Sequence, residues 1–270
     1  MGPLEGSSSG SLSPLSPLSI ARAYKLFSLC RNLITCRLEI GNLTGDDELI
    51  SFESTTALIS LPFLTKSSVR EEVTSLSRLF TLLHLPSLNY IEFHTVIEPT
   101  EQSSISLLSL LTRFRTMTKL VTDPRYYTRL DFINCLRLCP LLKSLYIRES
   151  SIFYWVMETP PDIPYCKIDD AFMRLFFEPS SNEGYLLCPH LEEFEITSKA
   201  RFSETTLLQF VKEKKGDSTT TGLAKLKKLY VSFDGVPLSD IKQELESYEA
   251  AGLVASLSYP VTHLSFTNTG

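Results

Sequence analysis

The chain has 270 residues, a formal net charge of −5 at pH 7, and a composition that is 43% hydrophobic and 21% charged. This composition is typical of a folded chain and argues against a disordered one. The acidic balance gives no general electrostatic reason to expect a nucleic acid or an anionic membrane as a partner. No apolar run approaches the ~18 residues that a membrane span needs, so no span is expected.

Residues 1–18 are rich in Ser, Gly and Pro and lack the basic and apolar segments of a secretory signal. We expect them to be a disordered N-terminus that precedes one repeat domain over residues 19–270. The six Cys are scattered, and Cys135, Cys139 and Cys188 lie within apolar stretches. This usage favours free, buried thiols in a reducing compartment, either the cytoplasm or the nucleus.

Leucine is unusually frequent, at 44 residues, and it recurs in a repeated pattern. Each copy has an apolar anchor, two intervening residues and then alternating apolar positions, as expected for a short strand. The copies, from the clear to the weak, are CRNLITCRLEI (30–40), CPLLKSLYI (139–147), CPHLEEFEI (188–196), LPSLNYIEF (85–93), FRTMTKLVT (114–122), LAKLKKLYV (223–231), VTHLSF (261–266) and LISLPFLT (58–65).

The expected anchors follow one another at intervals that, over the first five copies, lie in or near the leucine-rich-repeat range of roughly 20 to 29 residues. A longer gap between the fifth and sixth anchors implies an insertion or a degenerate repeat. The anchors are Leu33, Leu61, Leu88, Met117, Leu142, Leu191, Leu226 and Val261.

Stretches with helical spacing separate the expected strands, at residues 71–84 (running from Val69), 100–114, 125–138, 203–215 and 237–252. Thr100 and Ser203 are candidate N-caps, and Gly216 and Gly252 stand where C-terminal left-handed glycines are expected. Strands that alternate with helices at this spacing predict an α/β fold with a parallel sheet. We expect a leucine-rich-repeat solenoid, a right-handed coil of short parallel strands and helices.

Alternation along each strand sorts the side chains onto two faces of the sheet. The residues predicted to be buried include Leu142, Leu145, Ile147, Leu191, Phe194 and Ile196. The residues predicted on the outward face are Arg37, Glu39, Tyr90, Glu92, His94, Lys119, Ser144, Tyr146, Arg148, Glu193, Glu195, Lys228 and Tyr230. This mixture of Tyr, Arg and carboxylates suits a protein partner, and an ordinary solvated sheet face is the alternative.

The segment 151–167 is the second candidate binding element, because it collects aromatic residues around a Pro-Pro pair. It contains Phe153, Tyr154, Met157, Tyr165 and the single Trp, Trp155. Long loops of this kind extend recognition surfaces. The alternative is that these side chains fold back and cover the side of the repeats.

No motif for nucleotide binding, metalloprotease chemistry or a nucleophile elbow occurs in the chain. Cys135 and Cys139, with Cys188 and His190, could share a metal, but their apolar settings favour packing. The carboxylates of Asp169-Asp170 and of Asp46-Asp47-Glu48 could hold Mg²⁺, but each group precedes an apolar helical stretch and is better explained as a helix cap. We expect no catalytic site, no metal and no cofactor.

The segment LCPHLEEFEITSKARFSETTLLQFVKEKK (187–215), followed by LAKLKKLYVSFDG (223–235), resembles the C-terminal repeats of mushroom-type fungal F-box proteins. LRLCPLLKSLYI and LLHLPSLNYIEF are similar to earlier repeats of that family. The resemblance covers roughly residues 25 to 266. It implies a ubiquitin-ligase adaptor in which an F-box docks on the Skp1 subunit of a cullin ligase while the repeats present a target.

No F-box pattern precedes the first repeat, so the F-box is not expected within this chain, and Skp1 docking would need an F-box upstream. The expected function is non-enzymatic protein binding, as the substrate-recognition region of such an adaptor. A stand-alone leucine-rich-repeat scaffold without a link to ubiquitin is the second reading, and an enzyme is the third. The binding residues expected are Tyr90, Glu92, Tyr146, Arg148, Trp155, Glu193, Glu195 and Tyr230.

Overall fold

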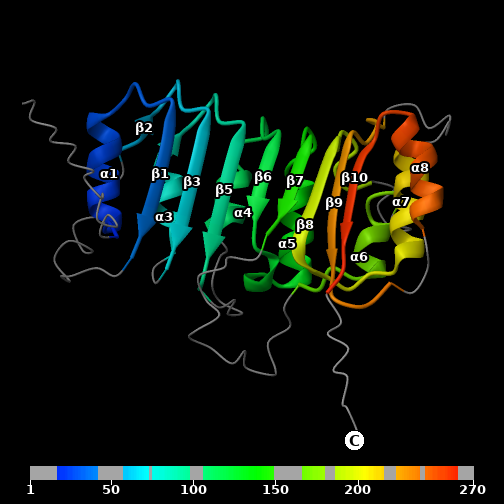
Figure 1. The fold of residues 1–270 in the computed structure, drawn as a ribbon. Coiled ribbons are helices and arrows are strands. Elements are labelled where there is room, and N and C mark those ends of the chain that lie inside the picture. Colours follow the sequence, from blue (N-terminus) through cyan, green and yellow to red (C-terminus); the bar gives the residue numbers. More distant parts are fainter. Residues whose placement is uncertain are drawn as a thin grey trace, which may run out of the picture.

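The chain is an α/β protein built on an eight-stranded parallel sheet (Figure 1). The computed structural model describes residues 17–41, 57–72, 75–97, 106–148, 166–179, 186–215, 223–237 and 241–260. The strands of the main sheet are β1 (Thr35–Ile40), β3 (Lys66–Glu71), β5 (Tyr90–Thr95), β6 (Lys119–Thr122), β7 (Ser144–Ile147), β8 (Glu193–Ala200), β9 (Lys228–Phe233) and β10 (Val254–Ser258).

These eight strands lie side by side in the order of the chain, and every neighbouring pair is parallel. Their first residues are aligned in register across the whole sheet, so equivalent side chains form rows. The first row is Thr35, Lys66, Tyr90, Lys119, Ser144, Glu193, Lys228 and Val254.

From β3 onward, a helix lies in each connection between successive strands of the main sheet, and the helices lie behind the sheet in the view of Figure 1, with α1 and α8 toward its two ends. Among the residues that the structure describes, the helices are α1 (Ile20–Leu29), α3 (Ser77–Thr81), α4 (Ser106–Leu111), α5 (Arg129–Arg137), α6 (Asp170–Arg174), α7 (Glu204–Lys215) and α8 (Lys242–Ala250), with one 3-10 turn, η1 (Pro124–Tyr126). A second, two-stranded parallel sheet joins β2 (Ile59–Ser60) to β4 (Leu83–His84).

The same backbone hydrogen bonds recur at the start of each strand. The carbonyl of the residue before one strand accepts two N–H groups from the start of the next, as when Thr65 O accepts from Asn89 and Tyr90 at 3.1 Å each. The carbonyls that accept such pairs are those of Ile34, Thr65, Asn89, Thr118, Lys143 and Glu192. Because the start of each strand is hydrogen-bonded to the start of the strand before it, these bonds fix the register of the sheet.

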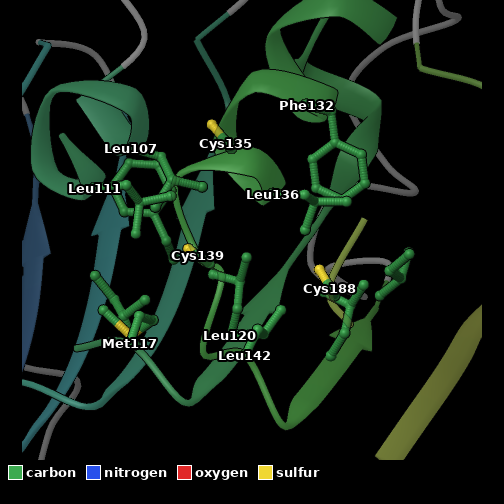
Figure 2. Packing of buried hydrophobic residues seen from close by; sticks show 14 of the residues in the cluster. Leu107, Leu111, Met117, Leu120, Phe132, Cys135, Leu136, Cys139, Leu142 and Cys188 are labelled. Carbon is green, nitrogen blue, oxygen red and sulfur yellow. The ribbon is translucent and has the colours of Figure 1, made fainter. Parts of the chain in front are cut away.

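Alternate strand residues point into one hydrophobic core between the sheet and the helices. The six residues predicted to be buried in β7 and β8 and at their anchors are confirmed, since each is at most 1% exposed: Leu142, Leu145, Ile147, Leu191, Phe194 and Ile196. Figure 2 shows how Leu120 and Leu142 on the strand side face Leu107, Leu111 and Leu136 on the helix side. Along most strands of the main sheet every second residue is buried, and the helices bury apolar residues against them. The sheet and the helices therefore form two layers with the core between them.

Phenylalanines pack together in the second half of this core. Phe132 stacks on Phe172 at 5.6 Å, and Phe176 contacts Phe172, Phe194 and Phe210 at 5.7, 5.6 and 6.1 Å between ring centroids. These rings join α5, α6, β8 and α7 across the long connection between β7 and β8. Each of these rings buries a large apolar area, so the cluster contributes much of the packing in this half of the core.

The predicted second repeat was placed three residues too early. Leu61 is the first residue of a turn in which the Leu64 N–H donates to the Leu61 carbonyl at 3.3 Å. The Leu88 N–H donates to the Leu85 carbonyl in the same way, at 3.2 Å. The anchor equivalent to Leu88 is therefore Leu64, two residues before β3. The sequence carried this signal, because Leu-Pro-Phe-Leu at 61–64 matches Leu-Pro-Ser-Leu at 85–88.

Two other boundaries differ from expectation. The helix predicted to run from Val69 is wrong at its start, because residues 66–71 form β3 and the helix is limited to Ser77–Thr81. Pairing with β1 and β5 outweighs the weak strand propensity of a segment with two serines. The last described strand is β10, at Val254–Ser258, which no repeat copy predicted. The expected strand at 261–266 lies outside the described residues.

The helix signals were largely correct where the structure describes them. Ser203 Oγ accepts the N–H of Thr206 at 3.2 Å, and Asp169 Oδ1 accepts that of Phe172 at 2.8 Å, as N-caps do. Gly252 has a φ of 90° and follows α8, with the paired backbone bonds of a Schellman ending. Thr100, Gly216 and residues 46–48 lie outside the described residues.

The first described residues join the sheet. Leu18 N–H bonds to Glu39 O at 2.8 Å, and Gly41 N–H bonds to Leu18 O at 3.3 Å, which places Leu18 along the outer edge of β1. Ser19 then caps α1. Among the described helices, none has the length and apolarity that crossing a membrane requires.

Candidate functional site

The candidate site is the exposed face of the main sheet, made by the strand residues that alternate with the core residues. Seven of the eight residues predicted to bind protein lie on this face: Tyr90, Glu92, Tyr146, Arg148, Glu193, Glu195 and Tyr230. The eighth, Trp155, lies outside the described residues with most of the 151–167 segment. We call this surface the sheet face.

Tyr146 of β7 contacts Glu193, Lys119 and Arg148 on the sheet face. Its hydroxyl donates a 2.5 Å hydrogen bond to Glu193 Oε2 on β8, and Ser144 Oγ donates to the same oxygen at 3.1 Å. Burial, followed by the hydrogen bond to Glu193, raises the pKa of Tyr146. The phenol is therefore a neutral donor at physiological pH, and its ring is held in place.

Two cations lie over the ring of Tyr146. Lys119 Nζ is 4.3 Å and Arg148 Cζ is 5.1 Å from the ring centroid. Lys119 Nζ also lies 5.4 Å from the centroid of the Tyr90 ring, on the neighbouring strand β5. Each cation–π contact of this kind contributes about 0.5 to 1 kcal/mol at an exposed site. The rings and cations form a continuous cluster across β5, β6 and β7.

Ion pairs extend this cluster toward β9. Arg148 Nη2 lies 2.8 Å from Glu195 Oε1, and Lys228 Nζ lies 2.9 Å from Glu193 Oε1. Hydrogen bonds from Tyr146 and then from Lys228 lower the pKa of Glu193 to about 2. Glu193 is consequently ionised at every physiological pH.

The β1, β3 and β5 part of the sheet face is also polar and paired. Arg70 reaches Glu39 at 3.4 Å and Glu72 at 3.2 Å, and His94 Nε2 lies 3.2 Å from Glu92 Oε1. Burial would raise the pKa of Glu92, but hydrogen bonds from His94 and Ser68 outweigh it and lower that pKa. Sequence reasoning missed the residues that β3 adds here, because it placed a helix over part of that strand.

This arrangement presents aromatic rings and guanidinium and ammonium groups on a rigid support. Tyr230 is 38% exposed, and Tyr90 and Tyr146 are partly exposed, so ring surface remains available. Aromatic residues and Arg held in place lose little entropy on binding, and these residue types dominate the binding energy of protein interfaces. The geometry suits recognition of another polypeptide.

The cysteines pack as hydrophobic side chains. All six are free, and Cys135, Cys139 and Cys188 are buried among leucine and phenylalanine side chains, as Figure 2 shows. Burial raises the pKa of Cys188 to about 12 and raises that of Cys135 and Cys139 as well. Neutral thiols are poor metal ligands and poor nucleophiles.

Two further candidate ligands, Asp169 and Asp170, have structural partners. Asp169 caps α6 and pairs with Arg129 at 2.9 Å, and Asp170 Oδ1 accepts the N–H of Ser203 at 2.7 Å. Over the described ranges, no group of three or more His, Cys, Asp or Glu residues is placed to hold a metal ion. Asp169 therefore joins α6 to α5, and Asp170 joins α6 to the start of α7.

Two buried charged residues also have structural partners. Glu71, 3% exposed, accepts the N–H of Leu76 at 2.6 Å and a hydrogen bond from Ser106 Oγ. Lys214, 2% exposed, donates to the carbonyls of Cys188 and Pro189 at 3.2 and 3.3 Å. Each satisfies backbone groups at a connection between a strand and a helix.

Comparison with models of known protein families and with curated proteins gave no match to this chain. The fold and the chemistry of the sheet face therefore carry the functional argument.

Proposed function

We propose that this chain is a non-enzymatic leucine-rich-repeat protein whose sheet face binds a protein target. The observation that carries the proposal is the shared register of the starts of eight parallel strands, which sets Tyr90, Tyr146 and Tyr230 on one face with their cations and carboxylates. A solenoid is supported by the strand order and by the recurring hydrogen bonds at each strand start. We further infer a right-handed coil, which is the usual sense for parallel strands joined by helices.

We propose, as the more specific role, the substrate-recognition region of an F-box-like ubiquitin-ligase adaptor. The support is the resemblance of the repeats to mushroom-type fungal F-box proteins, and Skp1 and cullin subunits would be partners through an F-box upstream. The second candidate is a leucine-rich-repeat scaffold with no link to ubiquitin. The free, buried thiols favour the cytoplasm or nucleus for either role.

Affinity capture from the cells that express the protein, with mass spectrometry, tests the proposal. The face variant carries Tyr230→Ala and Arg148→Ala, and a matched control carries Leu29→Ala and Leu130→Ala on exposed positions of α1 and α5. We expect the wild type and the control to retain the same proteins and the face variant to lose them. Equal capture by the face variant would contradict binding through the sheet face.

The same capture separates the two roles. Recovery of Skp1 and cullin subunits with the full-length gene product supports the adaptor. Targets recovered without any ligase subunit favour the scaffold.

A further inference from the structure

Lys119 differs from the other cations around the centre of the sheet face in how its charge is satisfied. Arg148 pairs with Glu195 at 2.8 Å, and Lys228 pairs with Glu193 at 2.9 Å. Within the part of the chain that the structure describes, no carboxylate lies within ion-pair distance of the Lys119 amine, which contacts the rings of Tyr90 and Tyr146 instead.

The carboxylates nearest to these rings are already engaged. The Tyr146 hydroxyl donates to Glu193, and the Tyr90 hydroxyl bonds to Glu92, which also accepts from His94. The rings therefore direct their polar ends away from Lys119 toward carboxylates on either side. Among the described residues, the contacts of this ammonium are therefore with ring faces, and no carboxylate forms an ion pair with it.

Burial of Lys119 under a bound partner would remove water from this ammonium. That removal is unfavourable unless the partner supplies an acceptor, and a charged acceptor compensates best. The side chain is only partly exposed, so it is already set between its two rings and loses little freedom on binding. Charge complementarity thus selects an anionic group on the partner.

We propose that Lys119, flanked by the ring faces of Tyr90 and Tyr146, receives a carboxylate side chain from the protein target of the sheet face. This inference rests on the proposed function and specifies the partner as an acidic segment. A carboxylate fits better than a phosphate because three carboxylates lie on nearby strands, Glu92 on the neighbouring strand β5 and Glu193 and Glu195 on β8, two strands away. A dianion is repelled by these charges about twice as strongly as a monoanion.

Selection from a displayed library of random 12-residue peptides tests this, with the full chain as bait. We expect peptides selected by the wild type to be enriched in Asp or Glu at one position. A synthetic peptide from that pool should bind Lys119→Met at least five times more weakly in fluorescence anisotropy, and Lys119→Arg within about threefold of the wild type.

Lys66→Met is the matched control, because Lys66 occupies the same register row two strands away and its loss changes the net charge equally. We expect less than a twofold change for this variant. Equal weakening by the two Met variants would indicate diffuse attraction and would overturn the proposal. So would a selected pool without acidic enrichment, or a phosphoserine peptide that binds more than ten times tighter than its Glu counterpart.

Failure of the inference and failure of the proposed function give different results. Peptides that depend on Tyr230 and Arg148 but not on Lys119 would leave the protein-binding sheet face standing and remove the carboxylate site. If no peptide is selected above the Tyr230→Ala, Arg148→Ala variant, both are rejected. Thermal melting by circular dichroism verifies that each variant is folded.

Discussion

Tyr146 donates a 2.5 Å hydrogen bond to Glu193 on the neighbouring strand, although the two residues are 47 positions apart in the sequence. The bond links the ring that carries two cations to the carboxylate that Lys228 neutralises. The ionised carboxylate of Glu193 therefore holds both the Tyr146 ring and the Lys228 amine in place on the sheet face.

Glu193→Gln should lower the free energy of unfolding at pH 7 by about 1 to 2 kcal/mol, because it removes a charged acceptor from Tyr146 and Lys228. The pKa of Glu193 is about 2 in the folded chain against an ordinary 4.5, so its contribution is complete above 4.5 and is lost as the pH falls toward 2. Urea unfolding of both proteins at pH 7, 5, 4 and 3 should show the difference shrinking below pH 4.5. Glu195→Gln is the control, with a loss below about 1 kcal/mol, since Arg148 is solvent-exposed.

Lys214→Met should change the alkaline dependence of stability. Burial lowers the pKa of Lys214 to about 8 in the folded chain, against an ordinary 10.5. Between these values the unfolded chain binds more protons, so the contribution of Lys214 to stability rises with pH. We expect the stability of the wild type relative to Lys214→Met to rise by about 1 to 2 kcal/mol between pH 8 and 10 in chemical unfolding.

Lys212→Met controls for the alkaline experiment, because Lys212 is on the same helix but exposed and paired with Glu244. Its difference from the wild type should stay constant over this range. A constant difference for Lys214→Met as well would contradict burial of the Lys214 amine.

Glu71→Ala should cost about 1 to 3 kcal/mol, because it removes the buried carboxylate that accepts hydrogen bonds from both Leu76 N–H and Ser106 Oγ. Glu71→Gln should cost less, since its amide carbonyl can still accept. Burial raises the pKa of Glu71, so the wild type should lose stability relative to Glu71→Gln as the pH rises from about 4.5 to 7. Guanidinium unfolding at both pH values measures this, and a wild type that gains stability over that range would refute it.

Native-state alkylation should modify one of the six cysteines rapidly. Cys30 is exposed, whereas the other five are buried. Burial raises the pKa of Cys36 to about 11 and that of Cys166 to about 12, which leaves little thiolate at pH 8. Mass spectrometry after brief iodoacetamide treatment should find label on Cys30 alone, and Cys30→Ser should abolish it. Rapid labelling of Cys135 or Cys139 would contradict the packed core.

The strands that sequence reasoning located well have an apolar anchor two residues before a strand of alternating side chains. Leu142 before β7 and Leu191 before β8 are of this kind, and the buried apolar residues of both strands were assigned correctly. Of the residues predicted to face outward there, Ser144 is buried, because it lies beside Glu193 and donates a hydrogen bond to it. Local periodicity is enough here because both the anchor and the alternation are properties of a few neighbouring residues.

The strands that the sequence failed to predict are ones whose formation depends on hydrogen bonds to neighbouring strands. Residues 66–71 are two serines, one valine and three charged residues, a composition with weak strand propensity. They form β3 because β1 and β5 supply hydrogen bonds on both sides. β10 has Gly252 where the other strands of the main sheet have a leucine or, before β6, Met117, so no anchor marked it, and pairing with β9 defines it. Intrinsic preference is weak beside such pairing.

The candidate site divides in the same way. Which residues face outward followed from alternation, so Tyr90, Tyr146 and Glu193 could be named from the sequence alone. The contacts of these side chains could not be predicted from the sequence. Lys119 contacts Tyr146, and Tyr146 contacts Glu193, only because the register of separate strands places them side by side.

The sequence by itself determined the repeated strand and helix pattern, the buried stripe and the set of outward residues, because each depends on spacing within one element. The tertiary structure alone decided which outward residues touch, which cation lacks a carboxylate, and where Glu71 and Lys214 are buried. Those properties depend on distances between residues far apart in the chain, and the packing of whole strands and helices sets these distances.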